Sequence, residues 1–415
     1  MIDGLDDAYP LTPLQQGMLY ETLKHPETDV YVTYILIDIH GDLDSGNLRY
    51  AWQAAMQQFE TLRTRFVWEG LDEPLQLVNS IAAPVWTDCG LPPDNVLVDC
   101  ANVNAVTDYW LRQERDTPLP ISETPPTRLR LINLFDSHHV LIWTVHHLLA
   151  DNWSTPLVLE AVASHYSAVS IGSDTPQSKT DQGFVYSHYV DWLSRATDQL
   201  QLNWWQQTLA ESRQTPIDIE QAYCVGADEV HGSRHERVCF KLTADQSLAV
   251  AALSRTTGCT LSSVMHAAWA LVVARYAGTS DATFGTSVSG RSCGLSGIEK
   301  AVGLFLNTLP TYININPGAS VDGFLNDVQS QLFKKIQFEH VALTDLLNMY
   351  PFRGTTTSFD SVLVVEAHSP ELFIEIPGTN VSLSNIRYST DSNFPLTALV
   401  FPGERLSIHL SLIHI

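Results

Sequence analysis

Apolar positions recur along the chain with two different periods, one typical of helices and the other of strands. Residues 43–59 place Leu48, Trp52 and Phe59 on one face of a helix. Residues 30–39, with the sequence VYVTYILIDI, are instead rich in β-branched and aromatic side chains and predict a strand. The chain therefore combines helices with half-buried or fully buried strands.

The first expected helix carries a start signal of its own. Thr12 can accept a hydrogen bond from the first turn, and Pro13 suits the first helical position. Gln15 stands at the third position, which completes a capping-box pattern. We expect this helix to run to about Lys24 and to end before Pro26.

The same two periods predict further elements across the rest of the chain. Helices are expected at about 105–115, 153–169, 186–195, 202–209, 244–256, 261–276, 321–338 and 343–349. Strands are expected at about 64–67, 75–78, 128–134, 139–145, 236–242, 282–287, 361–365 and 395–412. Both kinds occur in each half without regular alternation, which indicates the α+β class.

A polar, turn-rich segment divides the pattern. Residues 171–183 read IGSDTPQSKTDQG and show no apolar period, so they are the best candidate for a linker. The 415 residues also exceed the roughly 250–300 at which a single hydrophobic core stops growing. We therefore predict two α+β lobes, residues 1–178 and residues 179–415.

Composition and charge narrow the class of protein. Hydrophobic residues make up 45% and charged residues 17%, as in ordinary globular proteins. The net charge of −23 would repel nucleic acid and acidic membranes. We find no apolar run near the roughly 18–20 residues that span a bilayer and no signal-peptide pattern. A monomeric cytoplasmic protein without nucleic-acid or membrane partners is expected.

The cysteines give no sign of a metal or redox motif. None of the six forms a CxxC pair, which excludes a zinc knuckle built on that spacing. We interpret them as reduced, mostly buried thiols of a cytosolic protein. They are Cys89, Cys100, Cys224, Cys239, Cys259 and Cys293.

The segment with the most chemical content is residues 138–154, HHVLIWTVHHLLADNWS. It begins as a strand and becomes helical at its end, so His146 and His147 lie where a strand enters a loop, a frequent place for catalytic groups. Adjacent histidines on a strand face opposite sides, so one faces the packed interior and the other can face a cavity. Asp151 suits a turn that an arginine can fix by pairing, and Asn152 tolerates the positive φ that a tight reversal needs.

Competing interpretations of the histidines remain open at this point. A histidine pair on a strand is more often structural than catalytic, and we interpret His138 and His139 as such a pair because no acid follows at the same spacing. No HExxH motif is present and spacing supplies no third ligand, so no metal site is predicted. No GxSxG sequence offers a serine nucleophile. On its own, HHxxxD is compatible with an acyl-transfer histidine and with a structural pair.

The pattern HHxxxDxxS at this distance from the N-terminus resembles the core motif of condensation domains of nonribosomal peptide synthetases. Further segments resemble other motifs of that family, in the same order and over nearly the whole chain. They are PLTPLQQGMLYE (10–21), FETLRTRF (59–66), YSHYVDW (186–192), GTSVSGR (285–291), VGLFLNTLP (302–310), FEHVALTDLL (338–347) and DSNFPLTALV (391–400). Gln58 and Phe59 replace the usual Arg-His before Glu60, and His188 stands where aspartate is usual. The family's final helix has no counterpart before Ile415.

The resemblance implies a fold and a reaction. The fold is a V-shaped pseudo-dimer of two chloramphenicol acetyltransferase-like lobes around a central tunnel. The reaction joins a donor acyl or peptidyl thioester to the amine of an acceptor aminoacyl thioester through an amide bond. Both substrates are carried on the phosphopantetheine of carrier proteins, and no cofactor binds the domain directly. The implied partners are the upstream donor carrier, the downstream acceptor carrier and an adenylation domain of the same synthetase.

The resemblance also assigns roles to individual residues. His147 matches the histidine that faces the tunnel, and His146 matches the one that is usually structural; with Asp151 they form the predicted catalytic motif. Asp151 matches the acid that pairs with an arginine of the other lobe, and Arg291 matches that arginine. Asn152 replaces the usual glycine, which leaves the histidines and the acid intact, so we expect activity to survive.

Four further residues are expected to border the tunnel by the same resemblance, although core packing explains Trp153 equally well. They are Asn152, Trp153, Ser154 and Asn393.

Four alternative functions compete with peptide-bond formation. The intact HHxxxD motif argues against a non-catalytic docking platform. The VGLFLNTLP segment argues against an epimerase, and the absence of a DFGWG motif argues against a coenzyme-A acyltransferase. A terminal domain that cyclises and releases its peptide is not excluded. Within the family, the segments at 11–21 and 289–310 resemble domains that take a D-configured donor more than those that take an L donor.

Overall fold

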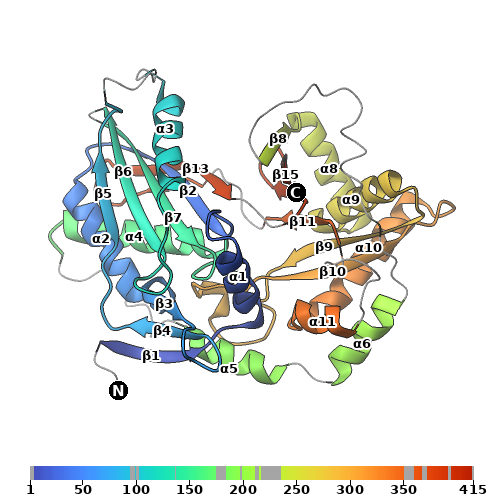
Figure 1. The fold of residues 1–415 in the computed structure, drawn as a ribbon. Coiled ribbons are helices and arrows are strands. Elements are labelled where there is room, and N and C mark those ends of the chain that lie inside the picture. The colour runs from blue at the N-terminus through green and yellow to red at the C-terminus, as the bar shows by residue number, and fades with distance from the viewer. Residues whose placement is uncertain are drawn as a thin grey trace. The chain divides into compact units, whose positions relative to one another are not determined.

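The fold is seen in a computed structural model of the chain (Figure 1). The structure describes residues 4–93, 99, 102–135, 137–173, 184–196, 199–210, 215, 235–349, 359–366, 372–390 and 394–413. Two compact units are present: the first comprises residues 1–192, 294–305 and 370–391, and the second comprises residues 193–293, 306–369 and 392–415.

The α+β class predicted from the sequence is confirmed, but the units differ from the predicted lobes of residues 1–178 and 179–415. Two segments from the C-terminal half, residues 294–305 and 370–391, pack with the first unit. The sequence places them in the second lobe because nothing in their local pattern reveals a long-range partner. The predicted boundary at residue 178 itself lies outside the described residues.

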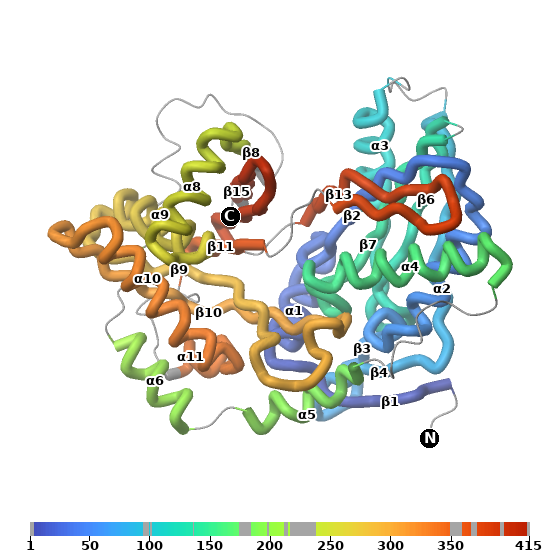
Figure 2. The backbone as a smooth tube through the Cα atoms, turned by 180° about the vertical axis from the view of Figure 1, so that it is seen from behind, coloured from blue at the N-terminus to red at the C-terminus, as the bar shows by residue number. Residues whose placement is uncertain are grey.

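The first unit is built on a six-stranded sheet with the strand order β12-β13-β2-β7-β6-β5. The strands are β2 (Val32–His40), β5 (Val85–Cys89), β6 (Thr127–Phe135), β7 (His138–His146), β12 (Ile374–Glu375) and β13 (Ser382–Thr390). A separate three-stranded sheet has the order β1-β4-β3 and comprises β1 (Leu5–Pro10), β3 (Thr64–Val67) and β4 (Leu75–Asn79). Figure 2 shows β13, from late in the chain, running beside β2.

Helices cover both faces of the six-stranded sheet. Trp52 of α2 (Ser45–Gln58) packs edge-on against Trp143 of β7 on one face. Val106 of α3 (Val103–Arg115) joins the apolar cluster on the other face, with Tyr34 of β2 and Ile142 of β7. This alternation makes β7 a central strand buried on both sides, so it is a rigid base for whatever follows it.

Three further helices belong wholly or largely to the first unit: α1 (Pro13–Lys24), α4 (Ser154–Ser170) and α5 (Tyr186–Ala196). The predicted capping box of α1 is confirmed, because the Thr12 hydroxyl accepts from the backbone of Gln15 and the Gln15 side chain accepts from the backbone of Thr12. The Gln15 side chain also donates to the Leu148 carbonyl, which fixes α1 against the loop after β7.

The second unit also has a six-stranded sheet, with the order β10-β9-β11-β14-β15-β8. Its strands are β8 (His235–Lys241), β9 (Asp281–Val288), β10 (Asn307–Asn314), β11 (Ser361–Val365), β14 (Leu396–Phe401) and β15 (Ser407–Ile413). Its helices are α6 (Gln199–Ala210), α8 (Ala244–Thr257), α9 (Leu261–Ala277), α10 (Val321–Ile336) and α11 (Leu343–Met349). The core packs Ala270 and Val273 of α9 against Phe284 of β9.

All the predicted helices are present within a few residues of their expected bounds, but five strands were missed: β1, β5, β10, β12 and β13. The expected strand at 395–412 is two strands, β14 and β15. The alternation of β13 is broken by a bulge between Ser384 and Arg387, where Asn385 has a φ of 49°. β1 carries two acids and a proline. An edge strand tolerates these residues, but they do not form the apolar pattern by which a strand is predicted from sequence.

Two predictions from composition can be compared with the described residues. Of the four cysteines there, only Cys259 is buried and Cys239 is exposed, so the prediction of mostly buried thiols is wrong for this set. Within the described helices none is alone long and apolar enough to cross a membrane, although α8 and α9, bent by 106° at their junction, reach that length and composition together.

Candidate active site

The loop after β7 is held in place by its neighbours on both sides. β7 pairs antiparallel with β2 and β6 along its length. The backbone pairing continues past the strand: the His146 amide donates to the Pro126 carbonyl at 3.0 Å, and the His147 amide donates to the Tyr31 carbonyl at 2.8 Å. Both histidines therefore start from a fixed backbone, as the sequence predicts for a strand end.

His146 is a buried, neutral connector. Its side chain is 1% exposed, and its Nδ1 accepts from the Leu148 amide at 3.1 Å. Its Nε2 lies 3.1 Å from the hydroxyl of Thr22 on α1, and that hydroxyl donates to the Met18 carbonyl. The proton must therefore be on Nε2. Burial, and to a lesser degree the neighbouring His147, lowers the pKa of His146 to about 3.

His147 has the opposite tautomer. Its Nδ1 lies 3.2 Å from the carbonyl oxygen of Ala150, which can only accept, so Nδ1 carries the proton. Its Nε2 lies 3.0 Å from the hydroxyl of Thr33 on β2 and keeps its lone pair. Burial lowers the pKa of His147, while the Ala150 carbonyl and the Asp151 carboxylate act in the other direction. The residue as a whole is half-buried, and Nε2 of its neutral ring is a nitrogen base paired with Thr33.

Asp151 fixes the loop rather than exposing a charge. The side chain is buried, and its Oδ1 accepts from the Ser154 amide at 3.1 Å and the Ser154 hydroxyl at 2.8 Å. Its Oδ2 accepts from the Phe305 amide at 3.1 Å, and its own amide donates to the Gly303 carbonyl at 3.1 Å. Asp151 thus holds Ser154, the first residue of α4, and ties the loop to the segment 294–305 of the same unit.

The other predicted site residues lie in different surroundings. Trp153 and Asn152 are partly exposed beside the loop, and the Trp153 indole donates to the Glu299 carbonyl at 3.0 Å. The positive φ expected at Asn152 is wrong. Among the described non-glycine residues, positive φ occurs at Tyr31, with 62°, and at Asn385. Tyr31 is therefore the residue whose unusual backbone presents a carbonyl to His147.

Two predicted site residues do not belong to the described part of the first unit. Arg291 belongs to the second unit, where it is buried and its amide lies 3.4 Å from the Ser289 hydroxyl. Its pairing with Asp151 stays a prediction. Asn393 lies outside the described residues.

Sequence reasoning missed the hydroxyl partners of both histidines. Thr22 and Thr33 are more than a hundred residues before them, and no local spacing signals the contact. Gly303 was contained in a family motif without a role of its own. A Cβ atom there would lie 2.6 Å from the Tyr186 ring, so only glycine lets this backbone approach both Tyr186 and Asp151.

The buried His146 should make the folding of the first unit sensitive to acid. Its pKa is about 3 when folded and near 6.5 when unfolded, so the unfolded chain takes up a proton first as the pH falls. This group's contribution is fully present above pH 6.5 and is lost as the pH falls toward 3, by up to about 1.4 kcal/mol per pH unit. Urea unfolding at a series of pH values between 7 and 5 measures this effect. The free energy of unfolding should change less with pH for His146→Gln than for the wild type.

The wild-type protein alone provides a second readout. The NMR signals of the His146 ring should stay those of a neutral imidazole down to pH 5, a range in which an ordinary exposed imidazole takes up a proton. Protonation of His146 near pH 6.5 would contradict the assignment.

Known proteins resemble this chain in sequence over nearly its whole length. The family model described as "Condensation domain" matches residues 5–412. The chain is 32% identical to Chondramide synthase cmdD of Chondromyces crocatus, over 97% of this chain and 11% of that protein. It is 30% identical to a linear gramicidin synthase of Brevibacillus parabrevis, over 98% of this chain and 5% of that protein. The chain thus spans about a tenth or less of the length of these relatives.

Solved structures share the fold. One is the first condensation domain of the calcium-dependent antibiotic synthetase in complex with a substrate analogue, which matches with a TM-score of 0.79 at 18% identity. The match covers 98% of this chain and 91% of the chain in that structure. The starter condensation domain of rhizomide synthetase RzmA, in complex with C8-CoA, also has a TM-score of 0.79 at 18% identity, covering 98% and 89%.

Proposed function

The chain belongs to the condensation domains of nonribosomal peptide synthetases, and from that premise we propose that it is catalytically active and that His147 is its reacting base. Condensation domains of this family are acyltransferases that form amide bonds. The observation that carries the proposal for this chain is the state of His147: a half-buried residue whose neutral imidazole has its Nδ1 proton fixed by Ala150 and carries no proton on Nε2.

The proposed reaction is the aminolysis of a thioester. The acceptor amine attacks the donor carbonyl carbon, a C–N bond forms, and the C–S bond to the donor phosphopantetheine breaks. The proton that leaves the amine passes through Nε2 of His147 to the departing sulfur, so no further reactant is needed. An α-amino group has a pKa near 7.7–8.0, and roughly a tenth is already free base at neutral pH. His147 therefore needs to orient the amine and relay a proton rather than act as a strong base.

Thr33 gives His147 a partner in both protonation states. While the ring is neutral, the Thr33 hydroxyl donates to Nε2. Once Nε2 holds a proton, the same hydroxyl must accept it, and it can turn its own hydrogen to the Thr390 hydroxyl at 3.3 Å. Thr390 in turn donates to the Val32 carbonyl at 3.4 Å. We propose that this chain of hydroxyls stabilises the imidazolium formed during the reaction.

Thr33→Val should therefore slow amide formation by about 10–100-fold, since a hydrogen bond to a charged group contributes about 1.5–3 kcal/mol. Without the hydroxyl the imidazolium is less stable, so the rise of activity with pH should shift to lower pH. The measurement is a single-turnover assay across pH with two loaded carriers. Thr33→Ser should restore most of the rate, and a Val variant with an unchanged rate and pH profile would refute the role.

The partners and carriers follow from the family and are also proposed. The relatives are peptide synthases many times longer than this chain, so we propose that a donor carrier, an acceptor carrier and an adenylation domain adjoin this domain and that it acts in the cytoplasm. Substrates would arrive as thioesters of carrier phosphopantetheine.

Reconstitution tests the function directly. The chain is mixed with a donor-loaded and an acceptor-loaded carrier, and the products are followed by mass spectrometry. Formation of the condensed product on the acceptor carrier supports the proposal. Inversion of the donor without condensation would indicate an epimerase instead. D- and L-configured donors compared in the same assay test the predicted preference for a D donor.

A further inference from the structure

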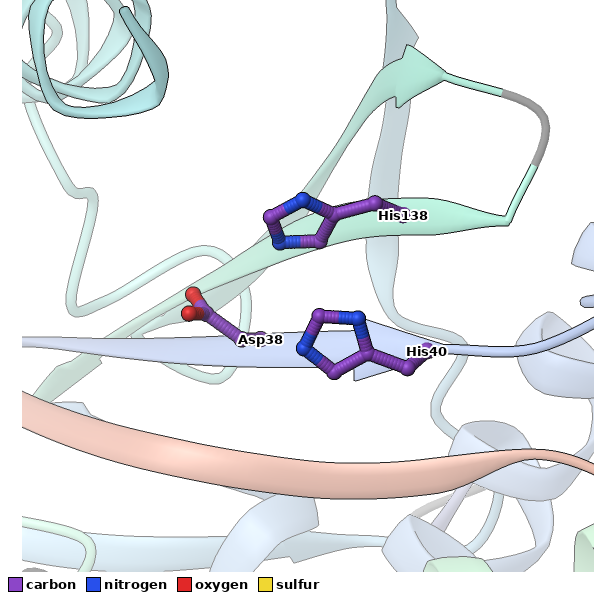
Figure 3. Close-up of side chains that lie close together, drawn as sticks. All are labelled: Asp38, His40 and His138. Atoms are coloured by element: carbon purple, nitrogen blue, oxygen red, sulfur yellow. The ribbon is translucent and has the colours of Figure 1, made fainter.

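A second group of polar side chains lies far from His147 on the same pair of strands. Asp38 and His40 extend from β2 and His138 extends from β7, with all three side chains on one side of the sheet (Figure 3). His138 and His146 are the two ends of β7, eight residues apart. At about 3.3 Å per residue, the group is therefore roughly 26 Å from the HHxxxD loop.

The pairing of the strands explains why these residues meet. His40 and His138 lie directly opposite each other in the β2–β7 register. Asp38 precedes His40 by two residues, so its side chain is on the same face. One nitrogen or oxygen from each of the three side chains lies within 4.8 Å of the others. No sequence spacing reveals this set, because about a hundred residues separate β2 from β7.

The donor set is that of a transition-metal site. Two imidazole nitrogens and one carboxylate oxygen are ligands that Zn²⁺ and related divalent ions bind in proteins. We propose that Asp38, His40 and His138 form a site for a divalent transition metal of the Zn²⁺ class, with water completing the coordination. The prediction from sequence that the chain has no metal ligands, and the structural role given to His138, are revised by this proposal.

Two hydrogen bonds hold the Asp38 carboxylate in a fixed orientation. Asp38 is 8% exposed; Arg387 donates to its Oδ1 at 2.8 Å and Asn385 donates to its Oδ2 at 2.8 Å. Both partners come from the bulge of β13, and Asn385 has a positive φ of 49°. A strained bulge that directs two side chains onto one carboxylate resembles the outer hydrogen bonds of metal ligands. A carboxylate has about four lone-pair directions, so two remain for a metal.

The histidines supply one fixed and one adjustable ligand. Within the part of the chain that the structure describes, Nε2 of His138 is buried and has no hydrogen-bond partner, which is an unfavourable state that a metal would relieve. His40 is exposed and stacks on His138 with ring centroids 4.4 Å apart and an angle of 23° between the planes. Stacked rings cannot both point their lone pairs at one ion, so binding requires the exposed His40 ring to turn.

The ion would join β2, β7 and, through Arg387 and Asn385, β13 at one end of the sheet. The positive charge of Arg387 opposes a cation nearby, so affinity depends on both imidazoles and on the Asp38 charge. The role is therefore to stabilise the sheet, separate from amide formation at the other end of the strands.

Titration with Co²⁺ and Zn²⁺ tests the proposal on the full chain. The wild type should bind one equivalent more of Co²⁺ than His40→Ala, with visible d–d absorption bands that Zn²⁺ displaces. Saturating Zn²⁺ should raise the melting temperature of the wild type and not that of His40→Ala, since binding to the folded state stabilises it. Asp38→Asn should weaken binding at least about tenfold, or 1.4 kcal/mol, by removing the anionic ligand.

The variants are chosen so that the outcome is decisive. His40 is exposed, so His40→Ala should melt like the metal-free wild type and keep its rate of amide formation. His188→Ala removes an exposed histidine of α5 and should bind as many equivalents as the wild type. Equal stoichiometry and equal spectra for the wild type and His40→Ala would overturn the proposal, as would a wild type that binds no Co²⁺.

Discussion

His147→Ala is expected to lower the rate of amide formation by about 10²–10⁴-fold, the usual contribution of a positioned acid–base group. The variant removes the neutral Nε2 that lies 3.0 Å from Thr33 and the Nδ1 that lies 3.2 Å from the Ala150 carbonyl. His147 is half-buried and follows a well-paired strand, so removal of its ring should leave the fold intact. A single-turnover assay with two loaded carriers measures the effect.

Kinetic constants can separate the two duties proposed for this histidine. If His147 only orients the acceptor amine, the alanine variant should mainly raise KM for the acceptor carrier. If it also relays the proton, kcat should fall and the rate should follow the free-base fraction of the amine alone. His188→Ala serves as the matched control, since it removes an exposed histidine from the same unit. Near-normal turnover in a well-folded His147→Ala protein would sink the catalytic assignment.

The arrangement around His147 could be predicted only in part. The order of strand, loop and helix follows from local periodicity, and opposite orientations for His146 and His147 follow from strand geometry. Their tautomers depend on the folded loop, where Nδ1 of His146 accepts from the Leu148 amide and Nδ1 of His147 donates to the Ala150 carbonyl. The hydroxyls of Thr22 and Thr33, which come from distant elements, then pair with the two Nε2 atoms. Local pattern therefore predicts the elements and the side-chain directions, whereas the hydroxyl partners come from distant parts of the chain.

The same distinction applies to the fold. Helices were predicted well because their apolar period and their caps are local, as at Thr12. β13 was missed because its pairing partner β2 lies some 350 residues earlier and its own alternation is broken at Asn385. The group formed by Asp38, His40 and His138 escaped notice for the same reason: register, rather than spacing, brings it together.

Asp151→Ala is expected to be the most destabilising single change in this loop, by about 3–5 kcal/mol, because each buried donor left without a partner costs about 1–3 kcal/mol. The carboxylate is 5% exposed and accepts from two backbone amides, those of Ser154 and Phe305, and from the Ser154 hydroxyl. Asp151→Asn should cost less, because its oxygen can still serve Ser154, but its NH₂ group would then meet the Phe305 amide, donor against donor.

Loss of the Asp151 carboxylate should also affect His147 through the adjoining peptide. Ala150, whose carbonyl holds Nδ1 of His147, immediately precedes Asp151, so release of the loop should also slow amide formation. Calorimetric melting and amide hydrogen exchange at residues 147–155 measure the two effects. Asp72→Asn, which removes an exposed charge of the same unit, should change neither. A normal melting temperature for Asp151→Ala would show that the loop does not depend on this carboxylate.

The family resemblance pairs Arg291 with Asp151, and melting measurements on a double variant can test that pairing. If the two charges interact, Asp151→Asn and Arg291→Ala should be non-additive: the double variant should be less destabilised than the sum of the single variants by about 0.5–3 kcal/mol. Additive effects would mean that the charges of Arg291, which is 9% exposed, and Asp151 do not interact. In that case the stabilising effect of Asp151 would come from its hydrogen bonds to Ser154 and Phe305.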